Sequence, residues 1–189
     1  MSATLYLIRH ATPDWNRTDI RYDIPPGPPL TAHGEAEAKQ LGEFLQTTGI
    51  AAIYASPLER ATRTAQIAVE RLGLEVVTDL EMIEWERDEA EVDVLARCRA
   101  RVDAAFDECM SCGPIALVSH GGPIRLVLAN LGLDPAEMDH YRRTFDRDNP
   151  VPPAGVWRIT RDAEGQFGKP ELVFAPSPYT RYTPTIVYV

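Results

Sequence analysis

Two histidines stand at the ends of two short apolar runs in this sequence. His10 follows residues 5–9 (Leu-Tyr-Leu-Ile-Arg), and His120 follows residues 115–119 (Ile-Ala-Leu-Val-Ser). Runs of this length are typical of buried strands, and in open α/β sheets ligands bind at the carboxyl ends of the strands. The pattern predicts that the two imidazoles face each other across one pocket, with His10 as a candidate nucleophile.

The residues near these histidines include groups that bind phosphate oxygens. Arg9 and Asn16 lie close to the first histidine in sequence and offer hydrogen-bond donors. Arg60 is expected in the first turn of a helix that follows a strand, where its guanidinium and the positive helix end are directed toward the same crevice. The glycines at 121–122 follow the second histidine and let the backbone come close to an anion. Together these groups favour phosphoryl transfer, which depends mainly on positioning and charge stabilisation.

The acidic stretch at residues 79–86 can supply the proton that such a reaction needs. A carboxyl group would protonate the leaving oxygen and later take a proton from water. We expect Glu84 in this role, because a site beside Trp85 would raise the pKa of its carboxyl by desolvation, and Glu81 is the alternative. This chemistry requires no metal, and arginines repel a cation, so no metal or other cofactor is expected.

Strand and helix patterns alternate along the sequence, which predicts βαβ units and a mostly parallel sheet. Thr31 is a candidate N-cap for the first helix. Two short strand patterns beyond residue 150 are predicted to form an antiparallel edge. The expected strands are residues 5–9, 51–55, 75–78, 115–118, 156–160 and 172–174, and the expected helices are residues 35–46, 58–72, 89–110 and 123–131.

Four short motifs, in this order, give the sequence a resemblance to the histidine phosphatase superfamily, the phosphoglycerate-mutase-like fold. The resemblance runs from Leu5 to about Gly132, roughly two-thirds of the chain. The motifs are Arg9-His10 with Trp15-Asn16 downstream, Pro29-Leu30-Thr31-Ala32-His33-Gly34, Ser56-Pro57-Leu58-Glu59-Arg60-Ala61 followed by Thr64-Ala65, and Ser119-His120-Gly121-Gly122. Four ordered motifs make this resemblance specific.

The resemblance implies both a fold and a set of roles. The fold is a three-layer α/β/α sandwich with a mostly parallel central sheet and a small helical cap insertion. In the site, His10 would be phosphorylated, Arg9, Arg60 and His120 would bind the phosphoryl group, and Asn16 would assist. His120 would thus serve both catalysis and phosphate binding.

We expect the chain to form a single domain of this type, residues 1–189. The cap insertion would span about residues 80–112, and edge strands with a tail would occupy about residues 150–189; the final residues fit either a packed edge strand or a free tail. Two departures from the family pattern stand out. Ala11 replaces a usual glycine, which matters only if the backbone there needs positive φ, and residues 82–86 lack the glycine that normally precedes Trp-Glu.

The composition limits the classes of partner. The chain has 19 basic and 28 acidic residues and a formal charge of −9, which argues against nucleic acid or an anionic membrane as the main partner. The amino terminus resembles neither a signal peptide nor a membrane span, so a cytoplasmic protein is expected. Cys98, Cys109 and Cys112 are interpreted as mainly buried thiols, and His33 and His140 as residues without a site role.

The sequence therefore predicts a phosphomonoester hydrolase that acts on an anionic small-molecule phosphate through a phosphohistidine intermediate. The connection between Arg60 and His120 is short, whereas the family's mutases carry longer insertions there that exclude water. A phosphoglycerate-mutase-type phosphotransferase is the first alternative. An inactive module that binds a phosphorylated ligand is the second. The natural substrate and the oligomeric state stay open.

Overall fold

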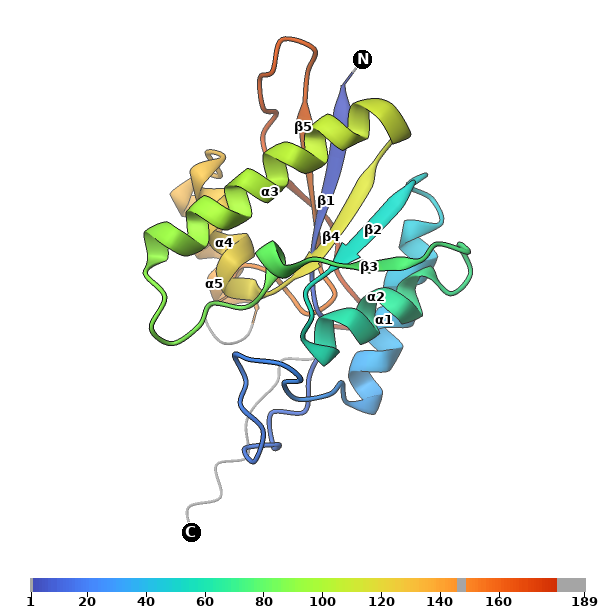
Figure 1. The fold of residues 1–189 in the computed structure, drawn as a ribbon, viewed down its shortest axis with the longest axis vertical. Coiled ribbons are helices and arrows are strands. Elements are labelled where there is room, and N and C mark those ends of the chain that lie inside the picture. Colours follow the sequence, from blue (N-terminus) through green and yellow to red (C-terminus); the bar gives the residue numbers. More distant parts are fainter. Residues whose placement is uncertain (1, 146–148, 180–189) are drawn as a thin grey trace.

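The computed structural model describes residues 2–145 and 149–179, and its centre is a six-stranded sheet with helices on both faces (Figure 1). The strand order is β3-β2-β4-β1-β5-β6. The first four neighbours in this order pair in parallel, whereas β5 pairs antiparallel with both β1 and β6. The strands are β1 (Ala3–Arg9), β2 (Ala52–Ala55), β3 (Val76–Thr78), β4 (Ile115–Ser119), β5 (Val156–Arg161) and β6 (Glu171–Phe174). The predicted mostly parallel sheet with an antiparallel edge is confirmed.

Both faces of the central strand β1 are buried, because its side chains alternate between two hydrophobic cores. Leu5 and Leu7 pack in the core formed with α3 (Glu91–Cys112) and α4 (Gly121–Asn130). Tyr6 and Ile8 pack in the other core, with α1 (Ala32–Leu45) and α2 (Glu59–Val69). Helices therefore form a layer on each side of the sheet, as expected for an α/β/α sandwich.

The start of α1 agrees with its sequence. The Thr31 hydroxyl accepts a hydrogen bond of 2.9 Å from the Gly34 backbone N–H, as expected for an N-cap. The helix α5 (Pro135–Thr144) was not predicted, since among its residues only Met138 is buried. Its start nevertheless has two ordinary sequence signals. Asp134 accepts hydrogen bonds as N-cap, and Pro135 occupies the first turn.

The segment expected as a cap insertion, residues 80–112, is in most of its length a layer of the sandwich instead. Its helix α3 buries Val102 and Phe106 against the sheet, where they join the same core as Leu5 and Leu7. The short 3-10 turn η1 (Leu80–Met82) also places Met82 in this core, and the following residues 83–90 contain neither helix nor strand. The apolar spacing of α3 already required a buried stripe, and the sheet provides the surface that covers it.

The remaining predictions concern the C-terminal part, the thiols and the membrane. The edge strands β5 and β6 are confirmed, whereas residues 185–189 lie outside the described residues. Cys98 and Cys109 are buried as expected, and Cys112 is exposed. Across the described residues, none of the helices has the length and apolar character needed to cross a membrane.

Candidate active site

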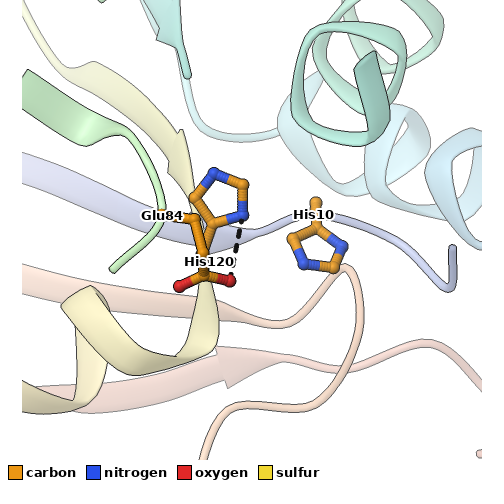
Figure 2. Close-up of side chains that lie close together, drawn as sticks. All are labelled: His10, Glu84 and His120. Atoms are coloured by element: carbon orange, nitrogen blue, oxygen red, sulfur yellow. Dashed lines mark ion pairs between the residues drawn. The ribbon is translucent and has the colours of Figure 1, made fainter. Parts of the chain in front are cut away.

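The two histidines come from neighbouring parallel strands. In the β1–β4 register Arg9 lies opposite Ser119, so His10 and His120 leave the sheet side by side at its carboxyl edge. Their ring centroids are 5.1 Å apart and the rings are tilted by 55°. Figure 2 shows both rings with the Glu84 carboxyl beside His120. The predicted pairing of the two imidazoles is confirmed.

The hydrogen bonds of His10 define its tautomer. Its Nδ1 lies 2.7 Å from the Ala11 carbonyl oxygen, which can only accept, so Nδ1 carries the proton. The lone pair of Nε2 therefore points away from the backbone and into the site. The Tyr22 hydroxyl lies 3.4 Å from Nε2 and donates to it. His10 is thus held in the form that can act as a nucleophile at Nε2.

Arg60 lies in the first turn of α2 and is fully buried. Its Nη1 donates to the Tyr22 carbonyl oxygen at 2.8 Å, and its Nη2 contacts Glu84 Oε2 at 3.3 Å. The guanidinium also stacks on the Tyr22 ring at 3.9 Å from the centroid. One guanidinium therefore links the irregular segment that contains Tyr22 to the acidic group of the site.

Arg9 is held by the turn at residues 149–151. Its Nη1 donates to the Val151 carbonyl oxygen at 2.7 Å. The Asn149 amide packs so closely on Gly121 that a Cβ there would lie 2.0 Å from Asn149 Nδ2. Glycine at the start of α4 is therefore needed for this turn to approach, which explains the glycine of the second histidine motif.

His120 contacts a hydroxyl on one side and a carboxyl on the other. Its Nε2 is 2.7 Å from Ser56 Oγ, and its Nδ1 is 3.6 Å from Glu84 Oε2 (Figure 2). Burial lowers the pKa of His120 well below its ordinary value, and the positive charge of Arg60 lowers it further. The same two causes, with Arg9 as a third, lower the pKa of His10. Both imidazoles are therefore neutral at physiological pH.

The two candidate acids lie in very different surroundings. Glu84 is buried, and its Oε1 accepts a 3.0 Å hydrogen bond from the Trp85 backbone N–H. Burial raises the pKa of the Glu84 carboxyl, while Arg60 opposes that rise. Glu81 is exposed, and its carbonyl oxygen accepts a hydrogen bond from Arg97. The surroundings thus favour Glu84 over Glu81 as a proton donor.

Three buried nitrogens of this site lack a hydrogen-bond partner within the part of the chain that the structure describes: Arg9 Nε, Arg60 Nε and His120 Nδ1. Buried polar groups are nearly always satisfied, and an unmade bond costs about 1–3 kcal/mol, more for a charged group. Because two of the three belong to guanidiniums, an oxyanion is the ligand whose chemistry satisfies them best.

A metal ion is the competing interpretation of the same cluster. Ligand atoms of His10, Glu84 and His120 all lie within 4.8 Å of one another, so their spacing alone is compatible with one ion. However, the guanidinium of Arg60 contacts Glu84, and Arg9 and Arg60 both act electrostatically on His10. Two fixed positive charges beside a metal site disfavour a cation and favour an anion.

A surface hollow of about 690 Å³ adjoins the site. Tyr22 and Trp85 line it from two different irregular segments, and Arg21, Asp23, Arg87 and Asp88 complete its walls. Tyr22 contacts the nucleophilic nitrogen of His10, and Trp85 follows Glu84 directly in the chain. The hollow therefore adjoins the candidate nucleophile through Tyr22 and the candidate acid through Trp85.

The comparison with protein families agrees with this geometry. Residues 5–94 match the model of the histidine phosphatase superfamily (branch 1), and this range contains Arg9, His10, Arg60 and Glu84. Over residues 5–94, just under half of its length, the chain is therefore similar to the histidine phosphatase superfamily.

The curated relatives and the solved structures that the chain resembles carry names of two activities, mutase and phosphatase. The chain is 36% identical over 104 residues to the probable phosphoglycerate mutase GpmB of Klebsiella pneumoniae (strain 342), which is 55% of this chain and 45% of that protein. The chain thus spans about half the length of the curated relatives it matches.

Solved structures that share its fold include two with different activities in their names. A mycobacterial glucosyl-3-phosphoglycerate phosphatase has a TM-score of 0.68 at 23% identity, covering 92% of this chain and 98% of that one. The phosphoglycerate mutase of Bacillus anthracis has a TM-score of 0.73 at 18% identity, covering 91% and 92%.

The first departure from the superfamily pattern has a structural explanation. Among the described residues Ala154 is the one non-glycine residue with positive φ, so the backbone at Ala11 does not need a glycine. Ala11 is fully buried, and its N–H donates to the Thr64 hydroxyl at 2.9 Å. The Cβ of Ala11 is therefore accommodated in the hydrophobic core next to His10.

Two site residues differ from the sequence prediction. Asn16 is exposed, and its recorded hydrogen bond runs from its backbone N–H to Asp14, so the structure does not bring its side chain into the cluster. Tyr22, in contrast, contacts both His10 and Arg60. In the sequence, Tyr22 is marked only by its place in a Pro-rich segment that follows the first histidine motif.

Proposed function

We propose that this protein is a phosphomonoester hydrolase of the histidine phosphatase superfamily that works through a phosphohistidine at His10. One observation carries the proposal. The lone pair of His10 Nε2 faces a site in which two guanidiniums and His120 Nδ1 have unused hydrogen-bonding capacity, next to a carboxyl with a raised pKa. Such a set binds the oxygens of a phosphoryl group and protonates its leaving group.

In the first step, His10 Nε2 attacks the phosphorus atom while the bond to the leaving oxygen breaks. Arg9, Arg60 and His120 bind the non-bridging oxygens, whose negative charge must be stabilised throughout the transfer. The proton of the Glu84 carboxyl passes to the leaving oxygen, and the alcohol departs through the hollow between Tyr22 and Trp85. The products are phospho-His10, a carboxylate at residue 84 and a free alcohol.

In the second step, water attacks the phosphorus of phospho-His10. The Glu84 carboxylate takes a proton from this water, the P–N bond breaks, and Nε2 regains its lone pair. Inorganic phosphate leaves and the carboxyl at residue 84 is again protonated. One carboxyl group thus serves both steps, first as an acid and then as a base.

The small amount of chain above the site favours water as the acceptor. Because α3 belongs to the sandwich, residues 83–90 are what remains of the expected cap, and the hollow beside Trp85 is open to solvent. A mutase must keep water out while the phosphoryl group waits on the histidine. The mutase names of several relatives keep phosphotransfer to a second hydroxyl as the alternative.

The substrate class follows from the same features. We propose a small phosphorylated molecule, since the site takes up one phosphoryl group and the adjoining hollow of about 690 Å³ is of the size that small ligands occupy. The relatives act, by their names, on phosphorylated glycerates and a glucosylated derivative of one, which makes phosphorylated metabolites the first compounds to assay.

Turnover of 4-nitrophenyl phosphate by the wild type and by His10→Asn tests the proposal. The assay contains EDTA, because the two arginines argue for metal-independent catalysis. We expect steady hydrolysis by the wild type and a loss of at least about 10³-fold in His10→Asn, since the covalent route is then closed. Binding of inorganic phosphate without any turnover would instead identify an inactive phosphate-binding module, and activity that EDTA abolishes would identify a metal enzyme.

A further inference from the structure

The segment that carries Glu84 has little regular structure of its own. After η1, residues 83–90 contain neither helix nor strand. A general acid works only when its proton is held within hydrogen-bond reach of the leaving oxygen, and a displacement of about 1 Å can cost 100-fold in rate. Something outside the segment must therefore fix the position of Glu84.

Arg97, in the second turn of α3, makes these contacts. Its Nη1 donates to the carbonyl oxygens of Glu81 at 2.7 Å and Ile83 at 3.0 Å, and its Nη2 donates to the carbonyl oxygen of Glu84 itself at 3.2 Å. Three backbone carbonyls within four residues thus accept from one guanidinium. Backbone groups in an irregular segment have no partners of their own, so these bonds define its path.

The contacts form a closed loop through Glu89. Arg97 Nε and Nη2 donate to the two carboxylate oxygens of Glu89 at 2.6 and 2.9 Å. The Glu89 carbonyl oxygen in turn accepts a 2.8 Å hydrogen bond from the Trp85 indole N–H. Arg97 therefore fixes the segment on both sides of Glu84, and the ring of the neighbouring Trp85 is fixed with it through Glu89.

These bonds use all of the donors that the side chain has. A guanidinium has five N–H groups, and Arg97 directs five donor–acceptor contacts to oxygens of residues 81–89. The side chain is only 15% exposed, so water competes weakly for them. A lysine has three donors on a point charge and cannot satisfy this arrangement.

We propose that Arg97 is a positioning residue that sets the distance of the Glu84 carboxyl from the phosphoryl group. The inference rests on the proposed function for its kinetic consequence, but its structural part concerns the folded protein alone. Arg97 acts through Glu84 and contacts neither His10 nor Arg60 in the described hydrogen bonds. Its loss should therefore affect proton delivery rather than nucleophilic attack.

Burial connects the position of Glu84 with its acidity. The carboxyl has a raised pKa because it is desolvated, and Arg60, Arg9 and His120 are the charged or titratable groups that face it. If the segment moves outward, water reaches the carboxyl and its pKa falls toward the ordinary value. The pKa of Glu84 thus reports its position without any turnover.

The kinetic test compares Arg97→Met and Arg97→Lys with Arg99→Met. Arg99 is a matched control on the same helix, since its guanidinium pairs with Asp103 and donates to Asn130 Oδ1, away from the segment. Each variant is assayed with 4-nitrophenyl phosphate, whose leaving group needs little protonation, and with phenyl phosphate, whose leaving group has a pKa of about 10 as in tyrosine. We expect Arg97→Met to lose about 10- to 100-fold in kcat/KM with phenyl phosphate and less than about 3-fold in kcat/KM with 4-nitrophenyl phosphate, because kcat/KM reports transfer to His10 and not the later attack of water. Arg97→Lys should lie between this variant and the wild type, and Arg99→Met should keep the wild-type ratio.

Partial unfolding cannot imitate this result, because it removes active enzyme equally for both substrates. Equal losses with the two substrates would therefore overturn the proposal. The second measurement is the carbon NMR titration of the Glu84 carboxyl in wild type and Arg97→Met, which requires no activity. A pKa that falls in the variant supports the proposal, and an unchanged pKa contradicts it. Should the wild type hydrolyse neither substrate, the proposed function fails while this titration still decides the role of Arg97.

Discussion

The Tyr22 hydroxyl lies 3.4 Å from His10 Nε2, the atom that would attack phosphorus. The same residue accepts a hydrogen bond from Arg60 through its carbonyl and stacks under that guanidinium through its ring. Tyr22 thus contacts the candidate nucleophile and a phosphate-binding group at once. A phosphoryl group on Nε2 would take the place of the lone pair as acceptor of this hydroxyl.

Replacement of Tyr22 by Phe keeps the ring on Arg60 and removes the hydroxyl. We expect kcat/KM for 4-nitrophenyl phosphate to fall about 10-fold, because a hydrogen bond to a charged oxygen contributes about 1.5–3 kcal/mol and part of it is already made in the free enzyme. Tyr54→Phe is the control, since the Tyr54 hydroxyl donates to Glu108 of α3 and to no residue of the site. An increase in kcat/KM in Tyr22→Phe would show that the hydroxyl only competes for Nε2.

Glu84→Gln removes the proton donor but keeps the size of the side chain. We expect a loss of about 10²- to 10³-fold in kcat/KM with phenyl phosphate and a much smaller loss in kcat/KM with 4-nitrophenyl phosphate, because kcat/KM reports transfer to His10 and not the later attack of water. The basic limb of the wild-type pH profile should also disappear, because the raised pKa of Glu84 sets the pH above which the acid is deprotonated. Glu81→Gln, at an exposed position, should behave as wild type; the opposite pattern would move the acid role to Glu81.

Arg60→Met should weaken inhibition by inorganic phosphate. A charge-assisted pair of hydrogen bonds contributes about 1.5–3 kcal/mol, so the inhibition constant is expected to rise about 10- to 100-fold. Arg63→Met is the control on the same helix, because Arg63 is exposed and pairs with Glu35. An unchanged inhibition constant in Arg60→Met would place the phosphate elsewhere.

Stability should fall as the pH is lowered below 6.5. Burial lowers the pKa values of His10 and His120 in the folded state, so between those values and 6.5 the unfolded chain binds more protons than the folded one. The free energy of unfolding then decreases with falling pH by up to about 1.4 kcal/mol per pH unit for each histidine. Glu84 has the opposite effect, because its raised pKa lets the folded chain hold a proton that the unfolded chain has lost at pH values above the ordinary pKa of a glutamate.

Urea unfolding between pH 5 and 8 measures this dependence. The decrease should be smaller in His10→Asn, which keeps one of the two buried imidazoles, and unaltered in His140→Asn, since His140 is exposed on α5. The same decrease in wild type and His10→Asn would contradict a neutral, buried His10.

The sequence located the histidines well because their positions follow from topology. A buried strand that ends in His10 and another that ends in His120 need only be parallel neighbours to bring the rings together, and β1 and β4 are. Arg60 was predictable for a similar reason, since the first turn of α2 follows β2 directly. Regular elements translate sequence position into spatial position, and these residues lie at their ends.

The errors concern segments whose conformation depends on distant contacts. Within the predicted helix 89–110, the apolar residues Val92 and Met110 are exposed, because the sheet covers a stripe of α3 that contains Val94 and Cys98. The place of Tyr22 depends on Arg60, 38 residues away in sequence, and no local pattern encodes that contact. Glu84 was predictable from its neighbour Trp85, whereas the bonds from Arg97 that fix it were not.

The central claim is that His10 carries the phosphoryl group during turnover. The most direct measurement is rapid acid-free quenching of the enzyme with a ³²P-labelled phosphomonoester, followed by localisation of the label by mass spectrometry. The account predicts an acid-labile phosphoryl group on Nε2 of His10 in the wild type, its accumulation in Glu84→Gln with a good leaving group, and its absence from His10→Asn. A label on Ser56, on a carboxylate or on His120, or turnover in His10→Asn at the wild-type rate, would contradict it.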